Sequence, residues 1–427
     1  MPAIKSVGAA LALATYWNRL AIVLGQRNFR WYWLSSSTQG LAIGTQFLVI
    51  GWLVLEVTES SAQLGLVIFL YGGPNVAFLF IAGVIADRFD RRLILIATQG
   101  SVAGVIGVLA CLTLVDIVAI WHVYTGAFLM GLIQSLSMPA RFAIIGDIVK
   151  PTSILDAVAM QNMAVHLGRM IGPAVAGVII EVWGVGAGLT VVSATYVASV
   201  VFVIGIGNLN QSESVDTESV FRNFVSGLVY IKNNSIILTV IIITCAFGGF
   251  GMSHMQVVPA IAKDTLGIGA ADIGLLFFAS GVGSLIGSLS LPGIPMRYVY
   301  RALLASLLVF SIVLLFFAWS NWFWVTWVFF LLVGVTGVGM TWPLATTMIQ
   351  IETSPEIRGR VLGVLQFTPG LHFLGAFPLA LVAGQLGWEF AITAAAGLSM
   401  ATTVWFALLR PRRPSLNNQM MLPTKIE

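Results

Sequence analysis

Long apolar runs separated by short polar breaks constrain this sequence more than any motif in it. Hydrophobic residues make up 58% of the 427 residues and charged residues 9%, whereas ordinary soluble domains are about 25% charged. A soluble fold would expose so many apolar side chains that it would aggregate. A bilayer core of roughly 30 Å needs about 20 apolar residues per helix. The sequence therefore predicts an all-α, polytopic membrane protein, and soluble enzymes and nucleic-acid binders are excluded.

The apolar runs predict twelve membrane-spanning helices, which together use about 240 residues and leave no room for a sizeable soluble domain. The predicted spans are 32–55, 63–86, 93–115, 119–140, 157–180, 186–207, 236–261, 270–291, 302–319, 322–349, 361–383 and 388–409. Cys111 and Cys245 both lie inside apolar runs, so neither a disulfide framework nor a metal site is predicted. No cofactor is expected.

Lysine and arginine residues predict the orientation, because cytoplasmic loops carry an excess of them. With the N-terminus inside, most basic residues fall on the cytoplasmic side: Lys5, Arg19, Arg27, Arg30, Arg88, Arg91, Arg92, Arg141, Lys150, Arg222, Lys232, Arg297, Arg301, Arg358, Arg360, Arg410, Arg412, Arg413 and Lys425. Lys263 falls outside, and Arg169 falls within a span. The outer loops carry Glu56, Glu59, Asp116, Glu181, Asp264, Asp272 and Glu389. Both termini are therefore expected in the cytoplasm, and the net charge of +4 needs no nucleic-acid partner.

Polar segments divide the chain into five expected parts. Residues 1–30 form a cytoplasmic or interfacial segment, 31–207 a six-helix half, 208–235 a cytoplasmic linker with an amphipathic helix, 236–409 a second six-helix half and 410–427 a cytoplasmic tail. The apolar run 7–17 is typical of a signal sequence or of an interfacial helix. We favour the helix, because no small-residue cleavage site precedes Asn18 and Arg19.

The two predicted halves contain an internal repeat. A shift of 209 residues aligns Leu64-Gly65-Leu66 with Ile273-Gly274-Leu275, and Gly72 with Gly281. The same shift aligns Arg88 and Arg92 with Arg297 and Arg301. Repeated halves around a site near the membrane midplane are typical of secondary transporters.

The loop after the second predicted span resembles the signature G-x-x-x-D-R-x-G-R-R of the major facilitator superfamily. Its matching residues are Gly83, Asp87, Arg88, Arg91 and Arg92, while Asp90 replaces the second glycine. The resemblance implies twelve helices in two pseudo-symmetric six-helix halves, with this loop as a conformational latch at their inner ends. Alternatively, the arginines serve only to fix the membrane orientation.

The fifth predicted span resembles the antiporter motif of exporters in this superfamily, G-P-x-x-x-G, at Gly172, Pro173 and Gly177. Simple helix packing is the alternative explanation of these glycines. The segments 28–30, 52–58 and 356–361 are similar to the exporter branch that includes siderophore and drug exporters. The arginine that drug–proton antiporters often carry in the fourth span is Ala127 here.

Polar residues inside the spans are the remaining candidates for function. Arg169 lies near a span centre, where a charge costs about 2.5–3.5 kcal/mol, so we expect it to contact an anionic substrate, a gate or backbone carbonyls. His166, His254 and His372 are candidate proton carriers, because histidine changes charge near neutral pH, or they are structural, hydrogen-bonded residues. The candidate substrate-cavity residues, some of which are expected only to bridge helices, are Gln39, Gln46, Asn75, Gln134, His254, Gln256, Trp342 and Gln366.

The sequence thus predicts a secondary active exporter of a small amphipathic or anionic, drug- or siderophore-like molecule. It is expected to act by rocker-switch alternating access in the inner membrane of a bacterium. The expected partners are the substrate, the lipid bilayer and protons as candidate coupling ions, with no nucleic acid, and the chain is expected to be a monomer. No lysine follows a glycine, so a nucleotide-binding P-loop is absent. An importer of a small solute and a membrane sensor or scaffold of the same fold are the alternatives.

Overall fold

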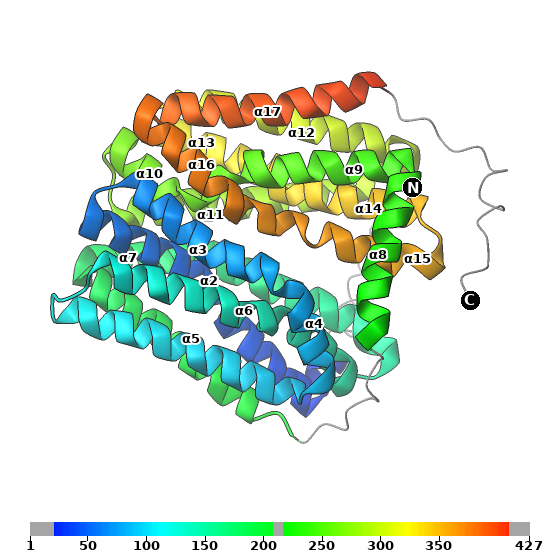
Figure 1. Cartoon of the computed structure of the whole chain (residues 1–427), viewed down its shortest axis with the longest axis horizontal. Coiled ribbons are helices and arrows are strands. Elements are labelled where there is room, and N and C mark those ends of the chain that lie inside the picture. Colours follow the sequence, from blue (N-terminus) through cyan, green and yellow to red (C-terminus); the bar gives the residue numbers. More distant parts are fainter. Residues whose placement is uncertain (1–20, 208–216, 410–427) are drawn as a thin grey trace, which may run out of the picture. The chain divides into compact units, whose positions relative to one another are not determined.

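A computed structural model describes residues 21–207 and 217–409 of the chain (Figure 1). Every regular element in these two ranges is a helix. This agrees with the apolar sequence, because a chain in lipid must satisfy its backbone N–H and C=O groups within its own helices. The prediction of an all-α protein is therefore confirmed for the described part of the chain.

The helices are long in the first range and more often interrupted in the second. The first range contains α2 (Arg27–Thr58), α3 (Ser61–Ala77), α4 (Leu79–Arg88), α5 (Arg91–Leu114), α6 (Ile120–Ile148) and α7 (Ile154–Ile204). The second contains α8 (Thr217–Asn233), α9 (Ser235–Ala246), α10 (Val258–Ile261), α11 (Ala270–Ser290), α12 (Val299–Ala318), α13 (Phe323–Val333), α14 (Trp342–Glu352), α15 (Pro355–Leu365), α16 (Leu371–Leu386) and α17 (Trp388–Leu409). Three π-helical segments, Phe247–Gly251, Ala262–Leu266 and Gly334–Thr341, follow α9, α10 and α13.

Ten helical segments in the described ranges are long and apolar enough to cross a membrane. One of them, Pro151–Ile204, has 54 residues, about twice the length that a bilayer requires. It contains Gly184 with φ 81° and ψ 171°, a conformation that glycine adopts most readily. The second predicted span instead corresponds to α3 and α4, which are separated at Phe78. The twelve predicted spans and the ten observed segments differ at these two places.

The end of α6 corrects the predicted fourth span. The predicted span ends at residue 140, with Arg141 in a cytoplasmic loop, whereas the helix continues to Ile148. Pro139 lies inside the helix and does not end it, because neighbouring groups in a membrane protein can satisfy a freed carbonyl. At about 1.5 Å per residue, Arg141 lies about 10 Å inside the end of the helix. Arg169 is therefore not the only arginine within a predicted membrane helix.

The helix α8 (Thr217–Asn233) lies within the expected linker 208–235, where an amphipathic helix is predicted. The side chains of Phe221 and Phe224 in this helix lie outside the described residues. Further along the helix Leu228 is exposed and Ile231 is buried. The next helix, α9, begins at a clear cap, because the Asn234 side chain accepts hydrogen bonds from the first backbone N–H groups of α9.

The helices form two compact units. Unit 1 contains the described parts of Met1–Glu59, Gly73–Asp216 and Ile268–Phe278, and unit 2 contains those of Ser60–Gly72, Thr217–Gly267 and Ala279–Glu427. Two helices are thereby divided, α3 after Gly72 and α11 after Phe278. Each of these two helices therefore contributes residues to both units.

In unit 1, α2 packs closely along α7. A Cβ atom on Gly168 would collide with the backbone of Gly40, so glycine at this position allows the two helix backbones to approach. A buried cluster shared by α2, α4, α5, α6 and α7 lies in the same unit: Val23, Phe29, Tyr32, Ala86, Ile94, Leu95, Ala140, Ile144, Ile145, Ile148, Val149, Ala157, Met160, Val203 and Ile206.

In unit 2, aromatic side chains fill much of the interior. The rings of Phe247 and Phe310 meet edge to face with centroids 4.9 Å apart, and those of Phe317 and Phe330 do so at 5.2 Å, a favourable arrangement for aromatic pairs. Phe247 begins the π-helical segment that interrupts the helix after α9. Irregular helix of this kind is frequent at functional sites, and the segment contains Gly248, Gly249 and Gly251.

Candidate functional site

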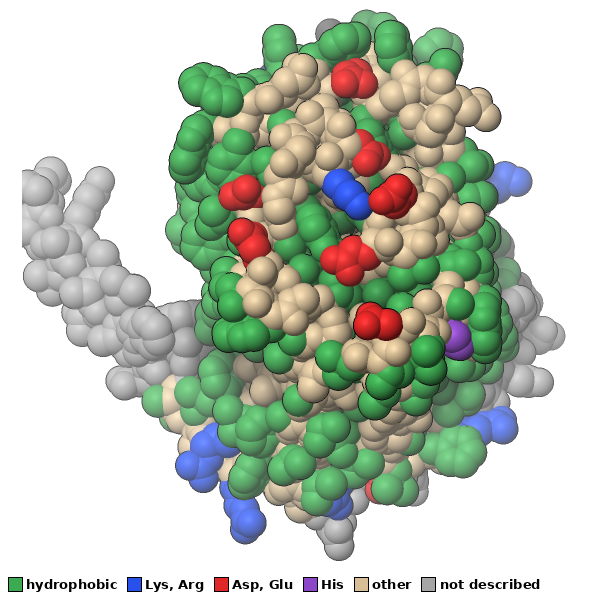
Figure 2. Space-filling model, turned by 90° about the vertical axis from the view of Figure 1, so that its left-hand side faces the viewer, with side chains coloured by type: hydrophobic (Ala, Val, Ile, Leu, Met, Phe, Trp, Pro, Cys, Tyr) green, Lys and Arg blue, Asp and Glu red, His purple; other side chains and the backbone are tan. Residues whose placement is uncertain are grey.

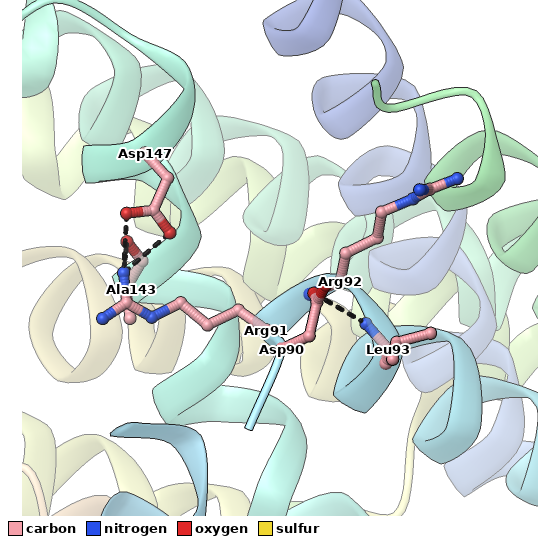
Figure 3. Close-up of polar contacts among 6 residues, drawn as sticks. All are labelled: Asp90, Arg91, Arg92, Leu93, Ala143 and Asp147. Carbon is pink, nitrogen blue, oxygen red and sulfur yellow. Dashed lines mark hydrogen bonds and ion pairs between the residues drawn. The ribbon is translucent and has the colours of Figure 1, made fainter. Parts of the chain in front are cut away.

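The loop that resembles the superfamily signature ties helix ends together within unit 1. Arg91, at the start of α5, points to Asp147 near the end of α6 (Figure 3), and its Nη1 lies 2.7 Å from each carboxylate oxygen. Asp90, which replaces the usual glycine, accepts hydrogen bonds from the backbone N–H groups of Arg92 and Leu93. It is therefore the N-cap of α5, a role that the sequence analysis did not predict.

Arg92 points away from Arg91 and reaches the end of α7. Its Nη2 donates to the carbonyl oxygen of Ile204 at 2.6 Å, and its Nε donates to that of Val203 at 3.3 Å. A cation at the last carbonyls of a helix also interacts favourably with the helix dipole. Arg91 and Arg92 thus hold three helices of unit 1 together, whereas the side chain of Asp87 lies outside the described residues and Arg88 is exposed.

The helix that resembles the antiporter motif packs on two neighbours within unit 1. The Oγ1 of Thr45 on α2 donates to the carbonyl oxygen of Gly172 at 3.2 Å, and a Cβ on Gly172 would lie 2.8 Å from the backbone nitrogen of Thr45. At Gly177, a Cβ would collide with the carbonyl oxygen of Ala270 at the start of α11. The motif residues therefore allow close approach to α2 and to the segment of α11 that belongs to unit 1.

Three of the predicted cavity residues belong to a buried polar seam between α2 and α6. We define this polar seam as Tyr32, Ser36, Gln39 and Gln46 of α2 with Gln134, Ser137 and Arg141 of α6. Gln39 donates to Ser137 at 3.1 Å, and Gln134 donates to Gln46 at 3.3 Å. Tyr196 of α7 also donates to the Gln46 side chain, at 2.7 Å. In this structure the glutamines of the seam bridge helices and are buried.

Arg141 lies at one end of the polar seam, beside Tyr32 and Ser36. It is 3% exposed, and its Nη1 donates to the Ser36 hydroxyl at 2.7 Å. The Tyr32 hydroxyl donates to the backbone carbonyl of Arg141 at 2.9 Å, and the tyrosine ring lies 6.0 Å from the guanidinium carbon. A buried charge at this depth is costly and is therefore a functional candidate.

The sequence contains a periodic signal for the polar seam. Positions 32, 36, 39 and 46 share one helical face of α2, and positions 134, 137 and 141 share one face of α6. Arg141 was not predicted because the fourth span was expected to end at residue 140. Tyr32, Ser36 and Ser137 lie within the predicted spans 32–55 and 119–140 but were not recognised as partners of the glutamines. The partner Tyr196 is distant in sequence and has no such signal.

His254 lies in an aromatic environment in unit 2. It is 1% exposed, its Nδ1 donates to the carbonyl oxygen of Gly251 at 2.6 Å, and its ring lies 5.7 Å from that of Phe317. Because a carbonyl oxygen only accepts, Nδ1 carries the proton and Nε2 is the free basic nitrogen of the neutral ring. Nε2 is buried without a hydrogen-bond partner within the described ranges. His254 does not line an open cavity in this structure.

The remaining predicted residues are distributed over both units. In unit 1, Asn75 donates to the carbonyl of Gly131 at 3.3 Å, while His166 and Arg169 are exposed and lie three residues apart on α7. In unit 2, the ring of Trp342 meets Phe247 edge to face at 5.4 Å and that of His372 lies 4.1 Å from Phe373. Gln256 is half-buried, and Gln366 is exposed after α15. The structure therefore brings together Gln39, Gln46 and Gln134 and leaves the others dispersed.

Comparison with known proteins identifies the family. A family model described as "Transmembrane secretion effector" matches residues 20–425. The staphyloferrin A transporter of Staphylococcus aureus is 24% identical over 363 residues, which cover 83% of this chain and 90% of that protein. The enterobactin exporter EntS of Shigella flexneri is 24% identical over 264 residues, 61% of this chain and 62% of that protein.

A solved structure shows the same fold at low sequence identity. The crystal structure of the nucleoside transporter NupG superposes with a TM-score of 0.71 at 14% identity, over 90% of this chain and all of that chain. The relatives and the fold are those of major facilitator transporters, which are not enzymes. The resemblance to this superfamily, and to its siderophore exporters, is confirmed.

Proposed function

We propose that this chain, which belongs to the family of transmembrane secretion effectors, is a secondary active exporter of a small amphipathic or anionic molecule. Membership of the family makes it a multi-pass membrane transporter of the major facilitator type. Our proposal adds to this family membership the export direction, the alternating-access mechanism and the coupling to protons. The names of the staphyloferrin A transporter and the enterobactin exporter support a drug- or siderophore-like substrate.

The division of α3 and α11 between the two units is the observation that carries the proposed mechanism. Residues Ser60–Gly72 of α3 belong to unit 2, and Ile268–Phe278 of α11 belong to unit 1. The internal repeat aligns these two segments with each other. Alternating access requires repeated elements that exchange packing partners as the site opens to either side. We therefore assign these two segments to the gate, and we propose two six-helix halves joined by the linker 208–235.

Carboxylates fasten both gate segments. Within unit 1, Glu181 accepts a hydrogen bond from the backbone N–H of Ala271 at 3.1 Å. Within unit 2, Asp264 accepts from the Ser61 hydroxyl at 2.6 Å and from the Trp388 indole at 2.9 Å. Acidic side chains are visible on the side of the molecule that Figure 2 turns to the viewer. We assign the acidic helix ends to the outer side and both termini to the cytoplasm, because basic residues accumulate on cytoplasmic loops.

The coupling ion in this proposal is the proton, and His166, His254 and His372 are its candidate carriers. His254 is the first choice, because its Nε2 is basic, buried and unpartnered in the described part of unit 2. Opening of the irregular helix around it would admit a proton to that nitrogen. Replacing His254 with glutamine should abolish the response of transport to a pH gradient, while the same change at His122, in the first turn of α6, should preserve it.

A transport screen in proteoliposomes tests the proposal. Vesicles of the purified protein receive drugs, siderophores and amphipathic acids, with and without an imposed pH gradient, and protein-free vesicles serve as the control. At least one class should move faster with protein, and faster still with the gradient. Binding without movement would favour a sensor or scaffold. Direction is tested in cells that lack the gene, which should accumulate the compound if the protein exports it and fail to acquire it if the protein imports it.

Arg169 is proposed to act in substrate selection or gating, because its side chain is exposed on α7 beside the motif glycines. Arg169→Ala should abolish transport or change which compounds are carried, while membrane insertion and expression stay normal. Arg169→Lys, which keeps the charge but not the planar fork, should retain part of the activity. Unchanged efflux of every accepted compound in Arg169→Ala would remove this residue from the mechanism.

A further inference from the structure

The guanidinium of Arg141 has one occupied position and one open edge. Its Nη1 donates to Ser36, whereas Nε and Nη2 are buried and have no hydrogen-bond acceptor among the described residues. Nε–H and Nη2–H project in parallel from the same side of the planar group. This side is the edge with which arginine holds a carboxylate through two parallel hydrogen bonds.

The known neighbours of Arg141 do not fill this edge. The Tyr32 hydroxyl donates to the backbone carbonyl of Arg141, and the tyrosine ring lies beside the guanidinium. Asp147, six residues further along α6, is engaged by Arg91 at 2.7 Å. A guanidinium in the membrane region with two donor nitrogens unsatisfied is unfavourable. The open edge is therefore shaped for an acceptor that the described residues do not supply.

Other buried groups of unit 1 are also incompletely satisfied. Within the described ranges, the side-chain oxygen of Gln161 on α7 is buried and has no hydrogen-bond partner. The side-chain oxygen and nitrogen of Gln99 on α5 are also buried without a partner in these ranges. The internal repeat aligns Arg141 with Gln350, which is exposed. The cationic group is thus a feature of the first half alone, whereas a purely structural element of the repeat would be expected in both.

We propose that the Nε and Nη2 edge of Arg141 binds the carboxylate group of the transported molecule, a small organic acid with an apolar body. This inference rests on the proposed transport function and deepens it. Arg141 is enclosed here, so the carboxylate reaches it in another state of the alternating-access cycle. The Ser36 hydrogen bond fixes the plane of the guanidinium and therefore the direction of the open edge.

The test measures binding of a defined probe to the full-length protein in detergent. The probe is 4-phenylbutyrate, and the isosteric neutral control is 4-phenylbutanamide at matched ionic strength. The carboxylate should raise the thermal unfolding midpoint and the amide should not. Arg141→Lys should weaken carboxylate affinity about tenfold or more, because lysine lacks the fork, and Arg141→Gln should abolish the response. Arg30→Lys, at an exposed arginine of α2, is the matched control and should bind like the wild type.

Each outcome decides for or against the site. No response of the wild type to the carboxylate, or an equal response in Arg141→Gln, would overturn the inference, provided that size-exclusion profiles show folded variants. A carboxylate of the chain itself is tested with Asp87→Asn. Asp87→Asn and Arg141→Gln could lower the thermal unfolding midpoint equally, with no further decrease in the double variant. In that case the open edge of Arg141 binds the carboxylate of Asp87, and the inference fails. If the protein binds 4-phenylbutyrate but transports no compound in vesicles, only the proposed function is contradicted. If it transports compounds along the imposed gradient but does not bind 4-phenylbutyrate, only this inference is contradicted.

Discussion

At the scale of single residues, Asp90 shows how a departure from a family pattern can be accommodated. The superfamily signature has glycine at this position, and Asp90 instead accepts two backbone hydrogen bonds at the start of α5. Aspartate is among the best N-cap residues, and glycine is only slightly worse. The substitution therefore preserves the beginning of the helix and, with it, the directions of Arg91 and Arg92.

Because Asp90 caps α5, we expect its substitutions to lower the stability of the protein to different degrees. Asp90→Asn should retain the thermal stability of the protein, Asp90→Gly should lower it by only a few tenths of a kcal/mol, and Asp90→Ala should cost about 0.5–2 kcal/mol. Hydrogen exchange of the first turn of α5, measured by mass spectrometry, should rise in the same order. Equal stability of the alanine and asparagine variants would show that the cap contributes nothing.

At the scale of elements, the sequence predicts helices well where a single apolar run matches a single helix. Span 388–409 and α17 (Trp388–Leu409) illustrate this agreement. The prediction was wrong at the end of α6, because proline and arginine usually mark a helix end in soluble proteins and here lie inside one. The π-helical segments were not predictable, since they depend on close contacts such as that of Gly248 with α16, which are distant in sequence.

The contact between α2 and α7 provides a prediction about helix packing. Gly168→Ala would place a methyl group against the backbone of Gly40, and the two helices would have to separate. Overpacking of this kind costs about 1–3 kcal/mol, so the thermal unfolding midpoint should fall. Gly104→Ala, also in a helix of unit 1 but with open space around its Cβ position, should leave stability unchanged or raise it slightly. Similar effects of the two substitutions would contradict the packing argument.

At the scale of the whole molecule, charge distribution and repeat were the informative parts of the sequence. Lysine and arginine positions and the 209-residue shift predict orientation and halves without any contact information. The division of α3 and α11 between units was beyond the sequence, because apolar helices carry the same pattern whichever neighbour they pack on. The ion pair of Arg91 with Asp147 could not be predicted from the sequence either, because several aspartate and glutamate residues were equally plausible partners for Arg91.

Two adjacent glycines in α3 allow a direct test of the proposed gate. In unit 2, a Cβ on Gly72 would collide with the side chain of Phe373, whereas a Cβ on Gly73 would meet no atom within 4 Å. Gly72→Val should therefore weaken the packing of Ser60–Gly72 in unit 2 and favour the state in which this segment is released. Gly73→Val changes the helix propensity equally and should have no such effect.

The measurement is the labelling rate of a cysteine introduced at Ala62, with Cys111 and Cys245 replaced by serine and an impermeant maleimide added outside. Gly72→Val should raise this rate about fivefold or more, since a destabilisation of 1 kcal/mol changes a population ratio by roughly that factor. Gly73→Val should label like the parent. Equal rates in the two variants would mean that release of this segment does not accompany opening, and the assignment of α3 to the gate would have to be abandoned.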